Sequence, residues 1–193
     1  GVNLSVTLNF ATTGLNALDT GTVASSTYYG IYFIYNPTTN VWGCIASLNT
    51  TKPTVLPAGF TAYALMGVVG TDGSAHIVAG FNQFARTGSF QQITIFTGHA
   101  SSASLISQSV AAAVPPIAKS LSGILGTTNG ASTGLDAGVA SDGCGTGAQP
   151  VNPSTTSFIA MGSFRDLQLT TAQTVYWSGG ASNMTMYVTG YTI

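Results

Sequence analysis

Few side chains in this chain could carry acid–base or nucleophilic chemistry. Glycoside hydrolysis needs two carboxylates across the scissile bond, but Asp19, Asp72 and Asp142 lie in turn-like contexts, where Asp commonly accepts bonds from its own backbone. Nucleophilic catalysis needs Ser or Cys beside a His that an acid orients, and no strand–turn–helix elbow accompanies His76 or His99. The G-x-S-x-G match at 130–134 lies in a glycine-rich, loop-like stretch without a helical pattern. We therefore expect no catalytic residues and a protein that is not an enzyme.

The sequence carries no signature of a metal or cofactor site. Cys44 and Cys144 are about a hundred positions apart and lack clustered His, so their spacing predicts neither a metal site nor a disulfide. No glycine-rich phosphate loop precedes a helical pattern. We expect no metal and no cofactor.

The charge content excludes two large classes of partner. Only 5% of residues are charged and the net charge is −1, whereas nucleic-acid binding and polybasic membrane attachment both need clustered Lys and Arg. The most apolar stretch, 105–125, is interrupted by Pro115, Pro116 and Lys119, so it predicts no membrane span. The chain starts at Gly1 in a strand-like pattern, which we interpret as a processed product or an excised fragment without a signal peptide.

Binding chemistry fits the composition better. Sugars are recognised by aromatic faces and planar polar groups presented on loops of a rigid scaffold, and the chain has 2 Trp and 8 Tyr among many Ser, Thr, Asn and Gln. The candidate ligand-binding residues are Trp42, Arg86, His99, Asn129, Asp136 and Asp142. Each has a structural alternative: Arg86 could equally cap a loop, and His99 could be a structural or surface residue at a strand end.

Short strands separated by turn signals must position these residues. The strand-like segments are 2–10, 28–35, 41–48, 63–81 (two strands around TDGS), 81–86, 89–98, 104–116, 117–126, 157–169, 174–180 and 184–193. The NPTTN turn predicts a hairpin of 28–35 with 41–48, and SGGAS predicts one of 174–177 with 184–193. With no helical period, the pattern predicts an all-β protein, a single antiparallel, jelly-roll-like β-sandwich over 1–193.

Two segments break the regular pattern. In 28–35, apolar residues occupy both odd and even positions, so we expect both faces of this strand to be covered. Residues 127–157 carry many Gly, Ser and Thr and predict a long loop, for which a functional and a disordered interpretation both stay open.

Four segments in order resemble C-terminal domains of bacteriophage and prophage tail fibres. They are GLNALDTGTVASSTYYGIYFIYNPTT, KPTVLPAGFTAYALMGVVGTDGS, VAAAVPPIAKSLSGILG and LQLTTAQTVYWSGGASNMTMYVTGYTI. Together they cover nearly the whole chain except 127–157. The chain departs from the family where basic residues follow the TDGS hairpin, since only Arg86 remains there.

The resemblance implies a β-sandwich at the distal end of a fibre, assembled as a homotrimer whose loops contact the host cell. It supplies no ligand-binding residues. We expect a receptor-binding adhesion domain for host attachment that recognises a carbohydrate such as lipopolysaccharide, or an outer-membrane protein. The domain would belong to the tail-fibre tip of the virion, a viral protein assembled in the bacterial host cytoplasm. The alternatives are a purely structural trimerisation module and a non-catalytic carbohydrate-binding domain of a tailspike depolymerase.

Overall fold

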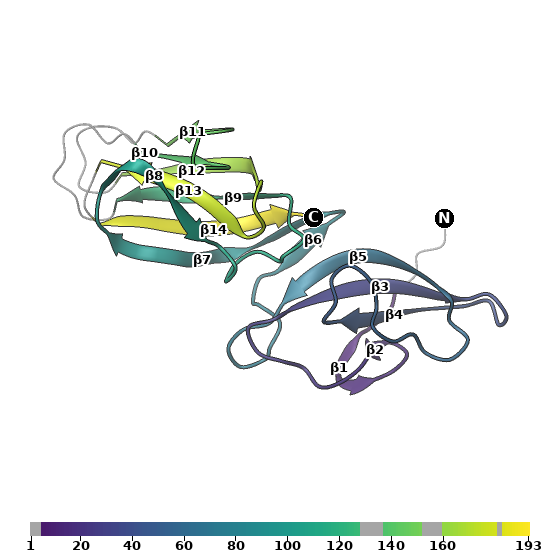
Figure 1. The fold of residues 1–193 in the computed structure, drawn as a ribbon. Coiled ribbons are helices and arrows are strands. Elements are labelled where there is room, and N and C mark those ends of the chain that lie inside the picture. The colour runs from purple at the N-terminus through teal and green to yellow at the C-terminus, as the bar shows by residue number, and fades with distance from the viewer. Residues whose placement is uncertain (1–4, 128–136, 152–159, 181–182) are drawn as a thin grey trace. The chain divides into compact units, whose positions relative to one another are not determined.

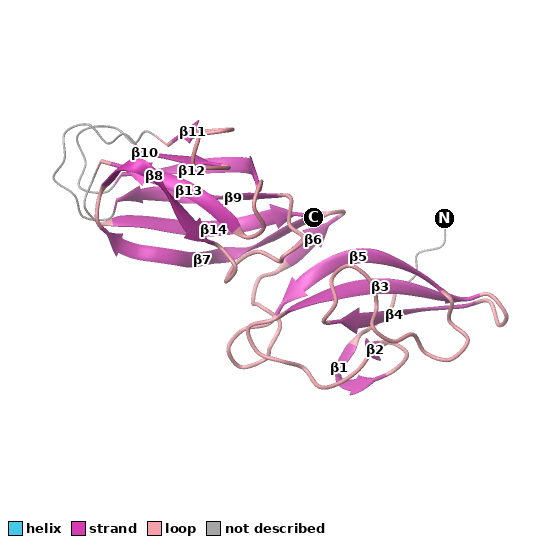
Figure 2. Cartoon of the chain, in the orientation of Figure 1, coloured by secondary structure: helices cyan, strands magenta, loops and turns pink. Residues whose placement is uncertain are grey.

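The computed structural model describes residues 5–127, 137–151, 160–180 and 183–193. Within these ranges the backbone forms strands, turns and bends, with no helix (Figure 2). The predicted all-β, antiparallel sandwich class is confirmed. The chain divides into two compact units, unit 1 (Gly1–Arg86) and unit 2 (Thr87–Ile193), while the single domain expected over 1–193 stays a prediction. No change of composition marks this division, since it falls in the short turn after Phe84.

Unit 1 is built on one five-stranded sheet. Its strands are β1 (Asn9–Thr13), β2 (Ala17–Leu18), β3 (Tyr28–Asn36), β4 (Val41–Ser47) and β5 (Ala62–Gly70), in the order β1-β2-β4-β3-β5 (Figure 1). The predicted β3–β4 hairpin is confirmed, with Asn36 opposite Val41. Its turn is held by the Asn36 side chain, whose Oδ1 accepts bonds from the N–H groups of Thr38 and Thr39.

Two strand predictions in unit 1 were wrong in part. Residues 5–8 of the predicted strand 2–10 alternate in burial as expected but have no sheet partner in the described chain, and β1 covers only 9–13. After β5, the TDGS turn forms, with the Asp72 carboxylate accepting from the N–H groups of Ser74 and His76. The strand expected beyond it is reduced to one isolated bridge, Thr71 to Ile77, because the turn bonds replace a ladder.

The two faces of β3 are covered by different segments of unit 1. On one face, Tyr32 and Ile34 pack with Ile45 beneath Leu56 and Phe60 of the connection after β4. On the other face, Tyr29 packs with Leu18 and Ala46, and Phe10 and Val23 close over them. That second cover does not extend along the whole strand, because Phe33 and Tyr35 remain only half-buried.

Unit 2 is a sandwich of two antiparallel sheets. Its strands are β7 (Thr87–His99), β8 (Ser102–Ser109), β9 (Ser120–Thr127), β10 (Ala137–Ala140), β11 (Gln149–Pro150), β12 (Ala160–Gln168), β13 (Thr174–Gly179) and β14 (Met184–Thr192). One sheet has the order β12-β9-β14-β7 and the other has the order β11-β10-β13-β8. The short strand β6 (Asn82–Phe84) precedes them, among the residues of unit 1.

The strand pairing of unit 2 is nested. The first strand pairs with the last, β7 with β14, and the second with the last but one, β8 with β13. Inside these, β9 pairs with β12 and β10 with β11. This is the wrapped order of a jelly roll, in agreement with the predicted fold class.

The core of unit 2 lies between its two sheets. Trp177 of β13 is fully buried, and its ring centroid is 4.8 Å from that of Phe96 in β7, on the facing sheet. The predicted hairpin of 174–177 with 184–193 was therefore wrong, since β13 and β14 belong to different sheets. Both strands send apolar side chains into the core, which places them across the sandwich rather than side by side.

The predicted loop over 127–157 was wrong for its middle part. Residues 137–140 form β10, which pairs with β13, and Val139 is fully buried opposite Trp177. Small residues such as Ala137 and Gly138 fill this strand, so its composition is that of a loop although its pairing is that of a sheet.

Candidate functional site

An exposed row of aromatic side chains lies on the β3–β4 hairpin of unit 1. Phe33 and Tyr35 point to the same face of β3, and Trp42 of β4 lies directly opposite Tyr35. The Tyr35 and Trp42 rings stack with centroids 4.2 Å apart, and the Phe33 and Trp42 rings are 5.8 Å apart. Trp42 is 52% exposed. We call Phe33, Tyr35 and Trp42 the aromatic ladder.

The ladder is oriented by the hairpin turn beside it. The Tyr35 hydroxyl donates a 2.8 Å hydrogen bond to Oδ1 of Asn40. Asn40 holds the left-handed conformation (φ 55°) that the turn requires, a conformation that Asn tolerates better than most residues. The exposed turn residues 37–40 thus place hydroxyl and amide groups next to the aromatic rings.

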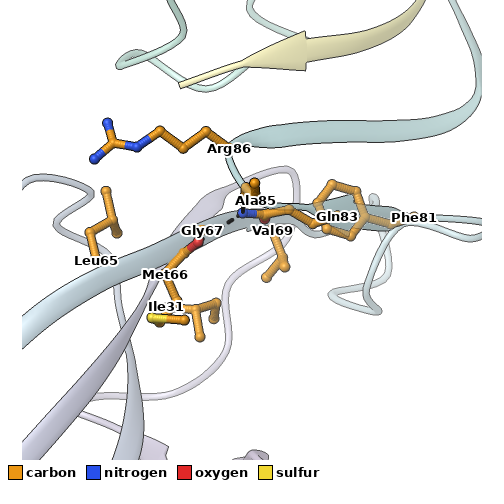
Figure 3. Close-up of a pocket in the computed structure, with 9 residues that line it drawn as sticks. All are labelled: Ile31, Leu65, Met66, Gly67, Val69, Phe81, Gln83, Ala85 and Arg86. Carbon is orange, nitrogen blue, oxygen red and sulfur yellow. Dashed lines mark hydrogen bonds between the residues drawn. The ribbon is translucent and has the colours of Figure 1, made fainter. Parts of the chain in front are cut away.

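The same face of β3 continues into a groove of about 440 Å³ within unit 1. The groove is lined by Ile31, Leu65, Met66, Gly67, Val69, Phe81, Gln83, Ala85 and Arg86 (Figure 3). Ile31 precedes Phe33 by two residues on β3, so it joins the groove to the ladder. The register of β5 shifts between the partners of Ile31 and Tyr32, and Met66 lies at this irregularity.

Gln83 fixes the floor of the groove. Its Nε2 donates to the carbonyl oxygens of Met66, at 2.9 Å, and of Ala85, at 2.8 Å (Figure 3). The amide can lie against β5 only because Gly67 has no Cβ, which would otherwise overlap the Gln83 side chain. Gln83 is therefore held in place at the floor of the groove.

Arg86 is the charged residue of the groove. Its side chain is exposed, and no carboxylate in the described residues forms an ion pair with it. In Figure 3 the guanidinium lies at the same end of the view as Leu65, away from Phe81. The structure thus places two of the predicted residues in unit 1, Trp42 in the ladder and Arg86 in the groove, and Ile31 of the groove shares a face of β3 with Phe33 and Tyr35 of the ladder.

The other predicted residues lie elsewhere. His99 in unit 2 packs over the core, with its ring 4.5 Å from Phe96 and 5.9 Å from Trp177. Asp142 holds a turn by accepting from the N–H groups of Cys144 and Thr146, and its bonds with Thr146 contribute most to lowering the pKa of its carboxyl. Asn129 and Asp136 fall outside the described residues.

Sequence reasoning missed several parts of this surface. Both faces of the strand at 28–35 were expected to be covered, whereas Phe33 is half-buried beside the exposed Trp42. The hairpin register would have revealed it, because pairing Asn36 with Val41 places Tyr35 opposite Trp42. No sequence signal marks Gln83 or Met66, since their position depends on an irregular register. A hollow of about 100 Å³ on unit 2, lined by Ser89, Ser122 and Asp166 among others, was also unpredicted.

Titratable side chains are sparse in the described residues. No group of three or more metal-binding side chains occurs in them. His76 and Asp72 approach to 3.8 Å, but both are well exposed and belong to one turn. No helix in the described parts is long and apolar enough to cross a membrane.

Comparison with known proteins gives no indication of the function. No protein-family model matches the chain, and no curated protein or solved structure matches it significantly.

Proposed function

We propose that this chain is a non-catalytic receptor-binding module at the distal end of a phage or phage-like tail fibre, which attaches to a host-cell glycan such as lipopolysaccharide. The observation that carries the proposal is the exposed aromatic ladder on the β3–β4 hairpin. The ordered resemblance of four long segments to tail-fibre C-terminal domains supports the fibre context.

Stacking is the binding mechanism that this surface favours. The C–H faces of a pyranose ring are apolar, and they bury against an aromatic face while the ring hydroxyls bond polar groups at the rim. The exposed half of Trp42 offers such a face, and the turn at 37–40 supplies the polar rim. Because Tyr35 and Asn40 already hold the rings in place, little side-chain freedom is lost on binding.

Adhesion by one such site would be weak, so we include assembly in the proposal. A homotrimer at the tip of a virion fibre, assembled in the host cytoplasm, would present three ladders to one cell surface. Linked sites raise the apparent affinity by about 10² to 10⁴ without any new contact.

The decisive test is Trp42→Ala, measured by binding of the purified protein to susceptible cells and to purified lipopolysaccharide. We expect a loss of at least about tenfold, because the exposed stacking face is removed. Tyr63→Ala is the matched control: Tyr63 is 47% exposed on the same sheet but pairs with Ile34, on the opposite face from the ladder. Wild-type binding by Trp42→Ala, or an equal loss with Tyr63→Ala, would contradict the proposal.

A second candidate function is a structural fibre-end module. It is favoured by exposed apolar side chains that another chain could cover: Phe84 is 87% exposed and Met66 is 52% exposed. Trimers that bind no susceptible cell would support this function. Light scattering coupled to size exclusion tests both candidates, because a stable monomer is incompatible with trimer assembly.

A further inference from the structure

In unit 1 the carboxylates are held by backbone hydrogen bonds, whereas the guanidinium of Arg86 has no ion-pair partner among the described residues. Its carboxylates, Asp19 and Asp72, both accept bonds from backbone N–H groups: Asp19 from Thr54 at 2.8 Å, and Asp72 from Ser74 at 2.8 Å. Neither carboxylate pairs with Arg86. The groove therefore has an uncompensated positive charge above a mainly apolar lining.

We propose that the groove binds the anionic substituent of an acidic glycan, a phosphate or a carboxylate, with the Arg86 guanidinium as its counter-charge. The inference rests on the proposed function and specifies its ligand class. The planar guanidinium offers paired N–H donors that match two oxygens of one phosphate or carboxylate.

The occupant follows from the continuity of the surface. Ile31, Phe33 and Tyr35 follow one another on one face of β3, so a single extended ligand can contact the groove and the ladder together. A sugar chain suits both parts, because its C–H faces could bury against the exposed Met66 side chain as against Trp42. One unpaired cation in this groove matches a ligand with an isolated negative group rather than a nucleic-acid backbone, which needs many cations.

The hydrogen bonds of Gln83 make the proposal specific. Both Nε2 donors of Gln83 bond backbone carbonyls, so Arg86 is the lining side chain whose charged donors remain free. An anionic group entering the groove would thus meet Arg86 first. A neutral glycan would gain the ladder contacts alone.

The test compares Arg86→Gln with wild type on purified lipopolysaccharide, on the same material after removal of its phosphates, and on a uronate-containing polysaccharide. We expect Arg86→Gln to weaken binding to at least one anionic glycan about tenfold and to leave the dephosphorylated form unchanged, since a hydrogen bond to a charged group is lost. The anionic glycan that loses affinity identifies phosphate or carboxylate as the substituent. Arg86→Lys should recover part of the loss. The matched control is Arg165→Gln, an exposed Arg of unit 2, which should bind as wild type.

The outcomes separate this inference from the proposed function. If Trp42→Ala loses binding while Arg86→Gln binds every glycan as wild type, the anionic site is refuted and adhesion through the ladder stands. If Arg86→Gln weakens binding to intact lipopolysaccharide, to its dephosphorylated form and to the uronate-containing polysaccharide by the same factor, Arg86 does not recognise an anionic group and the inference is also refuted. If Trp42→Ala binds normally, the proposed function itself fails. Raising NaCl from about 0.05 to 0.5 M should weaken wild type but not Arg86→Gln.

Discussion

Truncating one buried side chain in the core of unit 2 should lower the stability of unit 2 and leave the stability of unit 1 unchanged. Leu125 of β9 is fully buried, and Leu125→Ala removes three carbon atoms from the space between the sheets. At about 0.8 kcal/mol per buried methylene, the transfer contribution is about 2.4 kcal/mol, and the cavity left behind raises the total to about 3 kcal/mol. Because each 1.4 kcal/mol corresponds to a factor of ten, the opening equilibrium of unit 2 shifts by about a hundredfold.

Native-state hydrogen exchange read by mass spectrometry measures this shift in each unit. Peptides from β9 and β14 should exchange about a hundredfold faster in Leu125→Ala, whereas peptides from β3 and β4 should keep the wild-type rate. Ile45→Ala is the reciprocal variant, because Ile45 is fully buried in the unit 1 core, and it should give the opposite pattern.

One result would refute the reasoning. If β3 and β4 accelerate in Leu125→Ala by the same factor as β9, the chain opens as one cooperative body. The division at Arg86 would then describe contact density alone and not separate stability.

Two further predictions concern buried tyrosine and cysteine groups. Tyr32 donates a 2.7 Å bond to the Asn49 carbonyl, so Tyr32→Phe should lower the free energy of unfolding by about 1 to 2 kcal/mol in urea titrations. Burial, followed by the Tyr63 and Asp19 charges, raises the pKa of Tyr32 to about 12. In the unfolded chain the Tyr32 hydroxyl ionises near pH 10, so the free energy of unfolding should fall as the pH rises from 10 to 12. The fall should be less steep in Tyr32→Phe, which lacks this hydroxyl. Burial also raises the pKa of the Cys44 thiol, so a thiol reagent should label Cys144 quickly and Cys44 only on unfolding; two fast labels would contradict this.

The sequence predicted the local elements well where pattern and turn chemistry agreed. The NPTTN turn between two β-rich runs predicted the β3–β4 hairpin, whereas the strand predicted over 104–116 was wrong at its end, because β8 stops at Ser109 and a turn follows before Pro115. The hairpin depends on nearby residues, whose conformations are restricted by Pro and Asn themselves.

Long-range pairing could not be predicted in the same way. The SGG turn before β14 suggested a hairpin with β13, but β14 pairs with β7 and β9 in the other sheet. Local turn residues do not report which sheet a strand joins. The jelly-roll class was therefore expected while its strand order was not.

The candidate site was predicted in its exposed parts only. Trp42 and Arg86 could be named because a Trp after a turn and a rare Arg are visible in composition. Their connection through β3 depends on the register at Ile31 and on Gln83 reaching Met66, which no spacing in the sequence encodes.

The nested strand pairing of unit 2 also determines when its sheets can close during synthesis. Strand β14 lies between β7 and β9, so the sheet stays open until residues 184–192 have left the ribosome. At about 5 to 20 residues per second, the roughly one hundred residues after β7 begins take about 5 to 20 s to emerge. During that interval β7 and β9 expose unpaired edges and apolar faces, whereas every strand of the unit 1 sheet has already been translated. Nascent unit 2 is thus the part of the chain most in need of chaperone protection.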